Sequence, residues 1–377
     1  MRILQVSSAR AFGGGERHLA DLSRSLASRG HEVYAALAPD SPLRGPLLEA
    51  LPPGNVFDVP LRNALDLRGA TRLARLARES RADIIHAHVA RDYTLASFAA
   101  RRARPARLVI TRHVLFPLSR MHRRALSNAS RVIAVSDAVA RALRAQSIFA
   151  PEKIRVVANG VDLRRFEEAR AALEREAAES GTTQAPLRVG IVGELSEVKG
   201  QEDFVRAAAI LQNDFGSSVE FLVVGCDTSR SGEYGARLQK LVAELRLTES
   251  VRLLGRRDDI APLIASLDVL VSASRTESFG MVLAEAAACG VPAVATATEG
   301  AREIIDDGVT GSIVPIGDVR ALASSVASLL KDESLRRSLG LRARESARAR
   351  FGLERMTAET ERVYAEALGV EASGGLG

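Results

Sequence analysis

Two carboxylates with an unusual spacing stand in the C-terminal half of the chain, Glu277 and Glu285, within the stretch SRTESFGMVLAEAAACG. DVLVSAS before them is typical of a β-strand, and MVLAEAAACG is typical of a helix closed by Gly290. If both acids were helical, they would lie about 12 Å apart along the axis and about 80° apart around it. They therefore cannot share one proton, chelate one metal ion or act as the carboxylate pair of a retaining glycosidase.

The spacing fits a long ligand instead, with hydroxyl groups at each end and an anionic group in the middle. The amides at the start of the helix would hold the anion, since helix N-termini favour negative charge. A nucleotide-diphosphate sugar has this form. The amides in question belong to Phe279, Gly280 and Met281.

Two glycine-containing loops also follow expected strands. Gly13, Gly14 and Gly15 come after RILQVS and before a helix near Glu16, an arrangement that lets backbone amides approach an anion. A simple turn is the alternative, and neither the dinucleotide fingerprint nor the P-loop pattern is present. In GIVGELSEVKGQEDF, Lys199 precedes a helix and suits a phosphate. A surface lysine is the alternative there, but the chain has only four lysines against 48 arginines.

Several histidines lie near expected strand ends. His86 and His88 in DIIHAH point to the same side of a strand, but no third ligand stands nearby in the sequence, so we expect no metal site. His113 ends the strong strand RLVIT, where an imidazole could donate a hydrogen bond to a sugar hydroxyl or a developing charge. A structural histidine at the start of a loop is the alternative.

The loop after His113 mixes arginine with apolar residues, in the stretch RHVLFPLSRMHRRALSNASR. Such a mixture is typical of a segment that meets a lipid surface or a lipid acceptor. An ordinary solvated helix face explains the charge alone. The arginines that we expect to face an acceptor or an anionic membrane are Arg112, Arg120, Arg123 and Arg124.

The elements that must position these residues form two similar halves. Short apolar strands alternate with amphipathic stretches, which predicts stacked β-α units, and hence mostly parallel sheets covered on both faces. We expect an N-terminal domain over 1–165, a linker over 166–186, a second domain over 187–350, and a C-terminal helix and tail over 351–377 that packs back on the first domain. Open α/β sheets bind ligands at the carboxyl ends of their strands, so the two domains should face a central cleft.

Charge is unevenly divided between the halves. Residues 1–165 contain 28 Lys and Arg against 13 Asp and Glu, a difference of +15, whereas the remaining 24 basic and 33 acidic residues differ by −9. The basic half indicates an anionic partner. Nucleic acid is disfavoured, because aromatic residues are only 4% of the chain and Trp is absent. No apolar stretch is long enough to span a bilayer and the N-terminus reads as a strand, so we expect a cytoplasmic protein, peripheral on the inner face of the cell membrane.

The order of these motifs resembles the retaining glycosyltransferases of family 4, which have the two-domain GT-B fold. The resemblance runs through Gly13 to Glu16, HAH at 86–88, NGVD at 159–162, VKG at 198–200, the two-glutamate stretch with ACGVPAVAT, and GAREIIDDGVTGSIVP. It implies transfer of a sugar from a nucleotide-diphosphate sugar, with retention and without a cofactor or bound metal. The expected acceptor is a lipid-linked or cell-surface glycan, as in lipopolysaccharide, exopolysaccharide or glycolipid synthesis.

The resemblance also implies roles for matching positions. Glu277 would bind donor-sugar hydroxyls, Glu285 the ribose, and Lys199 the leaving phosphate, while His113 would contact the sugar near the reacting carbon. The amides of 279–281 and the loop of 13–15 would hold the diphosphate. One position departs from the family pattern, because Glu194 stands where many members have an arginine. A carboxylate would repel a diphosphate there, unless Glu194 points away or an arginine compensates, the candidates being Arg257 and Arg275.

Two other functions stay open at this point. A transferase with a soluble acceptor would differ only in what it glycosylates, and the basic first half argues mildly against it. A nucleotide-sugar-binding protein with little or no transfer activity is conceivable because of Glu194.

Overall fold

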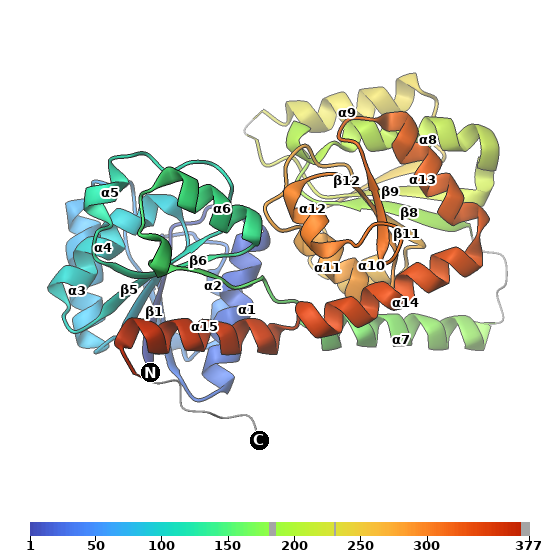
Figure 1. Ribbon diagram of the computed structural model, residues 1–377. Coiled ribbons are helices and arrows are strands. Elements are labelled where there is room, and N and C mark those ends of the chain that lie inside the picture. The colour runs from blue at the N-terminus through green and yellow to red at the C-terminus, as the bar shows by residue number, and fades with distance from the viewer. Residues whose placement is uncertain (181–185, 230, 371–377) are drawn as a thin grey trace. The chain divides into compact units, whose positions relative to one another are not determined.

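The computed structural model describes residues 1–180, 186–229 and 231–370, and it divides into two compact units (Figure 1). Unit 1 contains residues 1–160 and the described C-terminal segment from Leu353 onward, and unit 2 contains residues 161–352. Among the described residues, no helix is both long and apolar enough to cross a bilayer.

Unit 1 is built on a parallel seven-stranded sheet in the order β3-β2-β1-β4-β5-β6-β7. The central strand β1 pairs on both sides, with Ile3 opposite Val33 and Ile84. Because the strands of this sheet are covered on both faces, their sequences are nearly continuous apolar runs. The strands are β1 (Arg2–Ser7), β2 (Glu32–Leu37), β3 (Val56–Asp58), β4 (Ile84–Ala87), β5 (Arg107–Arg112), β6 (Ala129–Ala134) and β7 (Ile154–Val156).

Three helices of unit 1 share one buried core with the sheet: α1 (Gly14–Ser28), α2 (Arg44–Ala50) and α15 (Leu353–Leu368). Although α15 is the last helix of the chain, it packs against α1, β5 and β6 (Figure 1). Helices α3 and α4 pack together elsewhere on the sheet, and short 3-10 turns complete the connections. The remaining elements are α3 (Leu67–Glu79), α4 (Tyr93–Arg102), α5 (His122–Ala125), α6 (Asp137–Gln146), η1 (Pro53–Asn55), η2 (Ala90–Asp92) and η3 (Pro151–Lys153).

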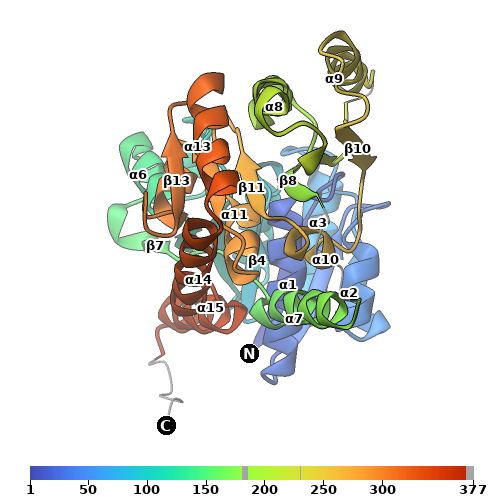
Figure 2. The same ribbon diagram turned by 90° about the vertical axis from the view of Figure 1, so that its right-hand side faces the viewer.

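Unit 2 repeats the plan with six parallel strands in the order β10-β9-β8-β11-β12-β13. Its strands are β8 (Leu187–Val192), β9 (Val219–Val224), β10 (Val251–Gly255), β11 (Val269–Ser272), β12 (Ala293–Thr296) and β13 (Gly311–Val314). Helices α8 (Gln201–Phe215), α9 (Glu233–Glu244) and α13 (Val319–Lys331) bury apolar side chains in one core with the sheet. Figure 2 shows α8 and α13 beside β8, β11 and β13.

The other helices of unit 2 pack around α11 (Met281–Ala288), which contacts α7 (Leu163–Ser180), α10 (Ala261–Ala265), α12 (Glu299–Ile304) and α14 (Glu333–Arg350). Two 3-10 turns, η4 (Glu197–Lys199) and η5 (Gly216–Ser218), flank α8.

The linker that the sequence analysis expects over 166–186 has a different structure in its described part. Residues 166–180 belong to α7, which packs against α10 and α11 and so is part of unit 2. Residues 181–185 lie outside the described part of the chain.

Candidate functional site

The strand order defines where each unit can bind a ligand. In both sheets the order in which successive strands are added reverses beside the first strand, between β1 and β4 in unit 1 and between β8 and β11 in unit 2. Ligands of open α/β sheets bind at the carboxyl ends of the strands at this point. The predicted site residues Gly13–Gly15, Lys199 and Glu277 follow three of these strands, β1, β8 and β11, and His113 follows β5, the neighbour of β4.

In unit 2, the structure brings two predicted residues from separate loops into direct contact. Lys199 Nζ lies 2.7 Å from Glu277 Oε2, and both side chains are mostly shielded, with 32% and 16% of their surface exposed. The loop after β8 can lie this close to β11 because residue 200 is glycine: its φ is +69°, and an added Cβ would meet the carbonyl oxygen of Ala273 at 2.1 Å. This close approach places a cation and a carboxylate side by side at the switch point.

The start of α11 is shaped by the next loop. Gly280 has a φ of +95°, which favours glycine, and the helix begins at the following residue, Met281. Gly300 N donates to Glu277 O at 3.0 Å, and a Cβ on Gly300 would press on Phe279 N at 2.7 Å. Because the side chain of Phe279 is buried against Phe351, this residue can reach a ligand only through its backbone.

Glu285 lies within α11 and is 5% exposed. A nearly buried carboxylate on a helix that starts at the switch point can accept hydrogen bonds from ligand hydroxyls with little competition from water. The nine residues from Glu277 to Glu285 thus span a loop and the first turns of a short helix rather than one continuous helix.

Glu194 is exposed, and its carboxylate accepts a hydrogen bond from the hydroxyl of Thr228 in the loop after β9. Neither candidate arginine neutralises it in the described part of the chain. Arg275 pairs with Asp203 at 2.8 Å, and Arg257 is exposed and forms no ion pair with Glu194. Because β9 and β11 flank β8 on opposite sides, Glu194 is anchored on the side away from Glu277.

In unit 1, the side chains of four histidines, His18, His86, His88 and His113, lie close together near the carboxyl ends of β4 and β5. His113 Nε2 lies 3.4 Å from His88 Nδ1, and the His18 ring is 4.8 Å from that of His113 and 5.8 Å from that of His88. Burial lowers the pKa of His18 to about 4. It also lowers the pKa of His86, His88 and His113 well below the ordinary value, and the neighbouring rings add to the effect. All four are therefore neutral at neutral pH.

The three glycines of the first loop form the start of α1, which begins at Gly14. Gly13 N donates to Glu16 Oε2 at 2.9 Å, so this amide is already occupied by a side chain. A Cβ on Gly15 would lie 3.5 Å from the His113 ring, so the loop packs directly against that imidazole. The glycine loop and the His113 side chain are therefore in direct contact.

The sequence prediction for Arg112 is wrong. This residue is 5% exposed, and its guanidinium donates to the carbonyl oxygen of Phe116, so it holds the loop and does not face a surface. The exposed residues of the segment are arginines interleaved with apolar side chains, namely Arg120, Arg123, Arg124, Val114, Phe116 and Met121.

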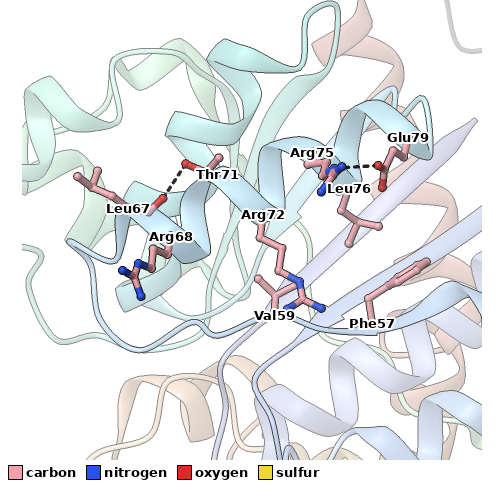
Figure 3. Close-up of a pocket in the computed structure, with 9 residues that line it drawn as sticks. All are labelled: Phe57, Val59, Leu67, Arg68, Thr71, Arg72, Arg75, Leu76 and Glu79. Atoms are coloured by element: carbon pink, nitrogen blue, oxygen red, sulfur yellow. Dashed lines mark hydrogen bonds and ion pairs between the residues drawn. The ribbon is translucent and has the colours of Figure 1, made fainter.

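A cavity of about 740 Å³ lies away from these residues, between α3 and the edge strand β3 of unit 1 (Figure 3). It is lined by Phe57, Val59 and Leu76, with the Arg72 side chain extending toward Val59 and Arg75 paired with Glu79 at 3.1 Å. It contains none of the predicted site residues. Its lining comes from residues 57–79 and not from the loops after β1, β4, β8 or β11, so we do not assign the site to it.

Sequence reasoning missed three residues that the fold brings to these clusters: His18, Asn159 and Thr228. His18 could have been found, since it stands on the first turns of a helix that follows the glycine loop. Asn159 and Thr228 reach their positions only through sheet order, which sequence spacing does not reveal.

Comparisons with known proteins agree with this geometry. Residues 12–165 match the model of Glycosyltransferase Family 4, and residues 174–346 match that of Glycosyl transferases group 1. N-acetyl-alpha-D-glucosaminyl L-malate synthase of Bacillus anthracis is 30% identical over 92% of both chains. A D-inositol 3-phosphate glycosyltransferase of Thermobispora bispora is 30% identical over 82% of this chain and 77% of its own length.

Solved structures show the same fold. The crystal structure of Anabaena HepE in complex with UDP and glucose superimposes with a TM-score of 0.84 at 25% identity, covering 97% of this chain and 99% of that one. The two parallel-sheet units and their strand-end sites define a nucleotide-sugar-dependent glycosyltransferase of the GT-B fold. The chain belongs to glycosyltransferase family 4.

Proposed function

We propose that this protein is a retaining glycosyltransferase that needs no bound metal and moves a sugar from a UDP-sugar to a hydroxyl group of a small anionic acceptor. The observation that carries the proposal is the 2.7 Å contact between Lys199 and Glu277 at the switch point of unit 2. Uridine as the base is supported by HepE, whose structures contain UDP and UDP-glucose.

In this proposal, the diphosphate lies over the start of α11, at the amides of Gly280 and Met281. An ammonium group has three N–H donors, so Lys199 can keep its contact with Glu277 and still donate to a phosphate oxygen. Glu277 would accept from sugar hydroxyls, Glu285 from the ribose, and exposed Arg257 would reach the nucleotide. The main catalytic effect is electrostatic, because negative charge grows on the leaving diphosphate as the bond to the sugar breaks.

Retention follows if the acceptor hydroxyl attacks the anomeric carbon on the face that the diphosphate leaves. The bond from this carbon to the phosphate oxygen breaks, the bond to the acceptor oxygen forms, and the acceptor proton passes to the departing phosphate oxygen. His113 would assist as a neutral hydrogen-bond donor to the sugar, since burial keeps its pKa well below the ordinary value.

A small anionic acceptor is favoured by two observations. The relatives include an N-acetyl-alpha-D-glucosaminyl L-malate synthase and a D-inositol 3-phosphate glycosyltransferase, and both malate and inositol phosphate are small anions that carry hydroxyl groups. The first 165 residues also contain 28 basic against 13 acidic residues, a charge that attracts anions.

A second acceptor class, a lipid-linked or cell-surface glycan at an anionic membrane, is favoured by the exposed segment after β5. Phe116 and Met121 are 67% and 84% exposed, beside Arg120, Arg123 and Arg124. Apolar residues next to arginines favour the interface of an anionic bilayer.

The test is UDP release from UDP-sugars by the purified chain, with L-malate, inositol phosphates or extracted membranes as acceptors. Turnover with small acids supports the first acceptor class, and turnover only with membranes supports the second. Tight binding of UDP-sugar with no UDP release under any condition would overturn the transferase proposal in favour of a binding protein.

The membrane proposal has its own measurement, which is sedimentation with vesicles of neutral or anionic lipid. If the segment meets a membrane, binding to anionic vesicles weakens with salt and is reduced at least tenfold in the double variant Phe116→Ser/Met121→Ser. The matched control is Leu65→Ser, which removes an apolar residue that is 84% exposed elsewhere in unit 1. Equal binding to neutral and anionic vesicles contradicts the proposal.

A further inference from the structure

The fold supplies the third imidazole that the sequence does not reveal. One ring nitrogen from each of His18, His88 and His113 lies within 4.8 Å of the others. They come from α1 and from the ends of β4 and β5, so only the sheet order brings them together. The pair that the sequence suggests, His86 and His88, is not the set that converges.

The spacing of two of these nitrogens already fits a metal site. Two ligands of a tetrahedral zinc ion lie about 3.4 Å apart, because Zn–N bonds are about 2.05 Å and the tetrahedral separation is about 1.6 times the bond length. His88 Nδ1 and His113 Nε2 are 3.4 Å apart. The nitrogen of His18 lies within 4.8 Å of the other two, and a side-chain rotation that brings it closer would complete the set.

Apart from the long 3.4 Å contact between His88 Nδ1 and His113 Nε2, the hydrogen bonds that the described residues form around the cluster do not occupy the converging nitrogens. Neither ring nitrogen of His18 has a hydrogen-bond partner, although this side chain is 1% exposed. His88 Nε2 is bound to Gln5 Oε1 at 2.8 Å, which leaves Nδ1 with its lone pair toward His113. Buried polar atoms are normally paired, so two unpaired nitrogens on one buried ring point to a missing ligand.

His86 supports this set without belonging to it. Its nitrogens are 2.7 Å from the hydroxyl groups of Tyr364 and Thr111, and its ring packs 4.1 Å from that of His88. Asn159 Oδ1 is also buried without a partner. The side chain of Asn159 raises the pKa of His18, against the larger lowering that burial causes. It can serve as a fourth, oxygen ligand or hold a bound water.

We propose that His18, His88 and His113 bind a divalent ion of the zinc class, and that the bound ion stops sugar transfer by withdrawing His113 from the donor. Imidazole ligands suit Zn²⁺, Ni²⁺ and Cu²⁺ rather than Mg²⁺ or Ca²⁺. The rings are neutral at neutral pH, so no proton has to leave before the ion binds. His113, which is partly exposed, provides the way in from solvent. The inhibition rests on the proposed transferase function, whereas the binding does not.

The test is titration of the full chain with ZnCl₂ in competition with a chromogenic chelator. We expect one tightly bound zinc per chain, at least a tenfold loss of affinity in His18→Ala and His18→Gln, and no change in the matched control His122→Ala, which removes a histidine from α5. Circular dichroism checks that the variants are folded, and the glutamine variant avoids the cavity left by alanine. Equal zinc affinity in the wild type and both His18 variants overturns the site.

The inhibition is measured separately, as the ratio of UDP release without and with saturating zinc in each protein. We expect a ratio of at least ten for the wild type and for His122→Ala, and a ratio near one for His18→Gln. Tight zinc binding with a wild-type ratio near one overturns the inhibition and leaves the site standing. If no protein releases UDP, the chelator titration still decides whether the site exists.

Discussion

The ammonium group of Lys199 lies 2.7 Å from Glu277, and about a third of its side chain remains open to solvent. We expect Lys199→Ala to lower kcat by about 100- to 1,000-fold, because the variant loses a preformed positive charge beside the leaving diphosphate. Stability should change by about 1 kcal/mol or less, since a partly exposed ion pair contributes little to folding. Steady-state UDP release and thermal unfolding measure the two effects.

The matched control is Lys240→Ala on α9, which removes another lysine from an ion pair, here with Glu244 at 3.6 Å. It should retain wild-type kcat. A kcat for Lys199→Ala within threefold of the wild type would show that the charge is not used in transfer.

Glu194 is a different case, because its carboxylate is held by Thr228 on the side of β8 away from Glu277. We therefore expect Glu194→Gln, which keeps an acceptor but removes the charge, to change kcat/KM for the donor by less than about twofold. An increase of tenfold or more would mean that the carboxylate does face the diphosphate and weakens its binding. Donor titrations at low and high salt separate this repulsion from a change in loop structure.

At the scale of elements, the loop between β8 and α8 depends on one glycine. We expect Gly200→Ala to reduce donor affinity at least tenfold and to destabilise unit 2 by about 2 kcal/mol or more. The added methyl group would clash with the carbonyl of Ala273, and residue 200 has a φ of +69°. Urea unfolding and donor titration are the measurements.

Gly232→Ala is the control, since residue 232 has a φ of +64° and a ψ of +15°, in the same left-handed region as residue 200, but has nothing within 4 Å of an added Cβ. It should cost only about 1 kcal/mol, the strain of the backbone conformation. Equal effects of the two substitutions would show that close packing on β11 does not position the loop.

Elements with long apolar runs could be predicted from the sequence, and two short edge strands could not. RILQVS and VEFLVVG become β1 and β9 because buried parallel strands are apolar throughout. The strands β7 and β13 were not predicted. β7 is an edge strand of three residues and β13 an edge strand of four, and neither segment carries enough periodic signal to be distinguished from a loop.

Some features of the candidate site could likewise be predicted from the sequence, and others could not. Strand-end loops could be predicted as ligand-binding positions, because parallel strands place their carboxyl ends along one edge. The contact between Lys199 and Glu277 and the convergence of His18 with His113 depend on which strands are neighbours. Arg112 shows the opposite error, since its charge suggested a surface and the fold buries it under its own loop.

At the scale of the whole molecule, the histidines are unequally divided between the two units, and all six lie in unit 1. His18, His86, His88 and His113 have lowered pKa values in the folded chain, so between about pH 6.5 and pH 4 the unfolded state binds protons that the folded state does not. Stability from these groups is therefore full above pH 6.5 and is lost as the pH falls.

Two acids, the buried Asp92 and the half-buried Glu16, oppose this trend in part. Burial raises the pKa of Asp92 to about 6 and raises that of Glu16, so the folded state gains protons at these groups. Four histidines outweigh two acids, and we expect the free energy of unfolding of unit 1 to fall by about 2 to 4 kcal/mol between pH 7 and pH 5.5. Unit 2 has no histidine and should change much less over this range.

Hydrogen exchange followed by mass spectrometry measures the two units separately in the intact chain, through peptides from β1, β4 and β5 in unit 1 and from β8 and β11 in unit 2. After correction for the intrinsic pH dependence of exchange, protection should fall in unit 1 and persist in unit 2 at pH 5.5. His18→Leu should make the loss in unit 1 shallower by about one proton, while His122→Ala, which lies on α5 outside the cluster, should not. Parallel loss of protection in both units would show that the buried histidines do not govern acid unfolding, and that the units unfold as one.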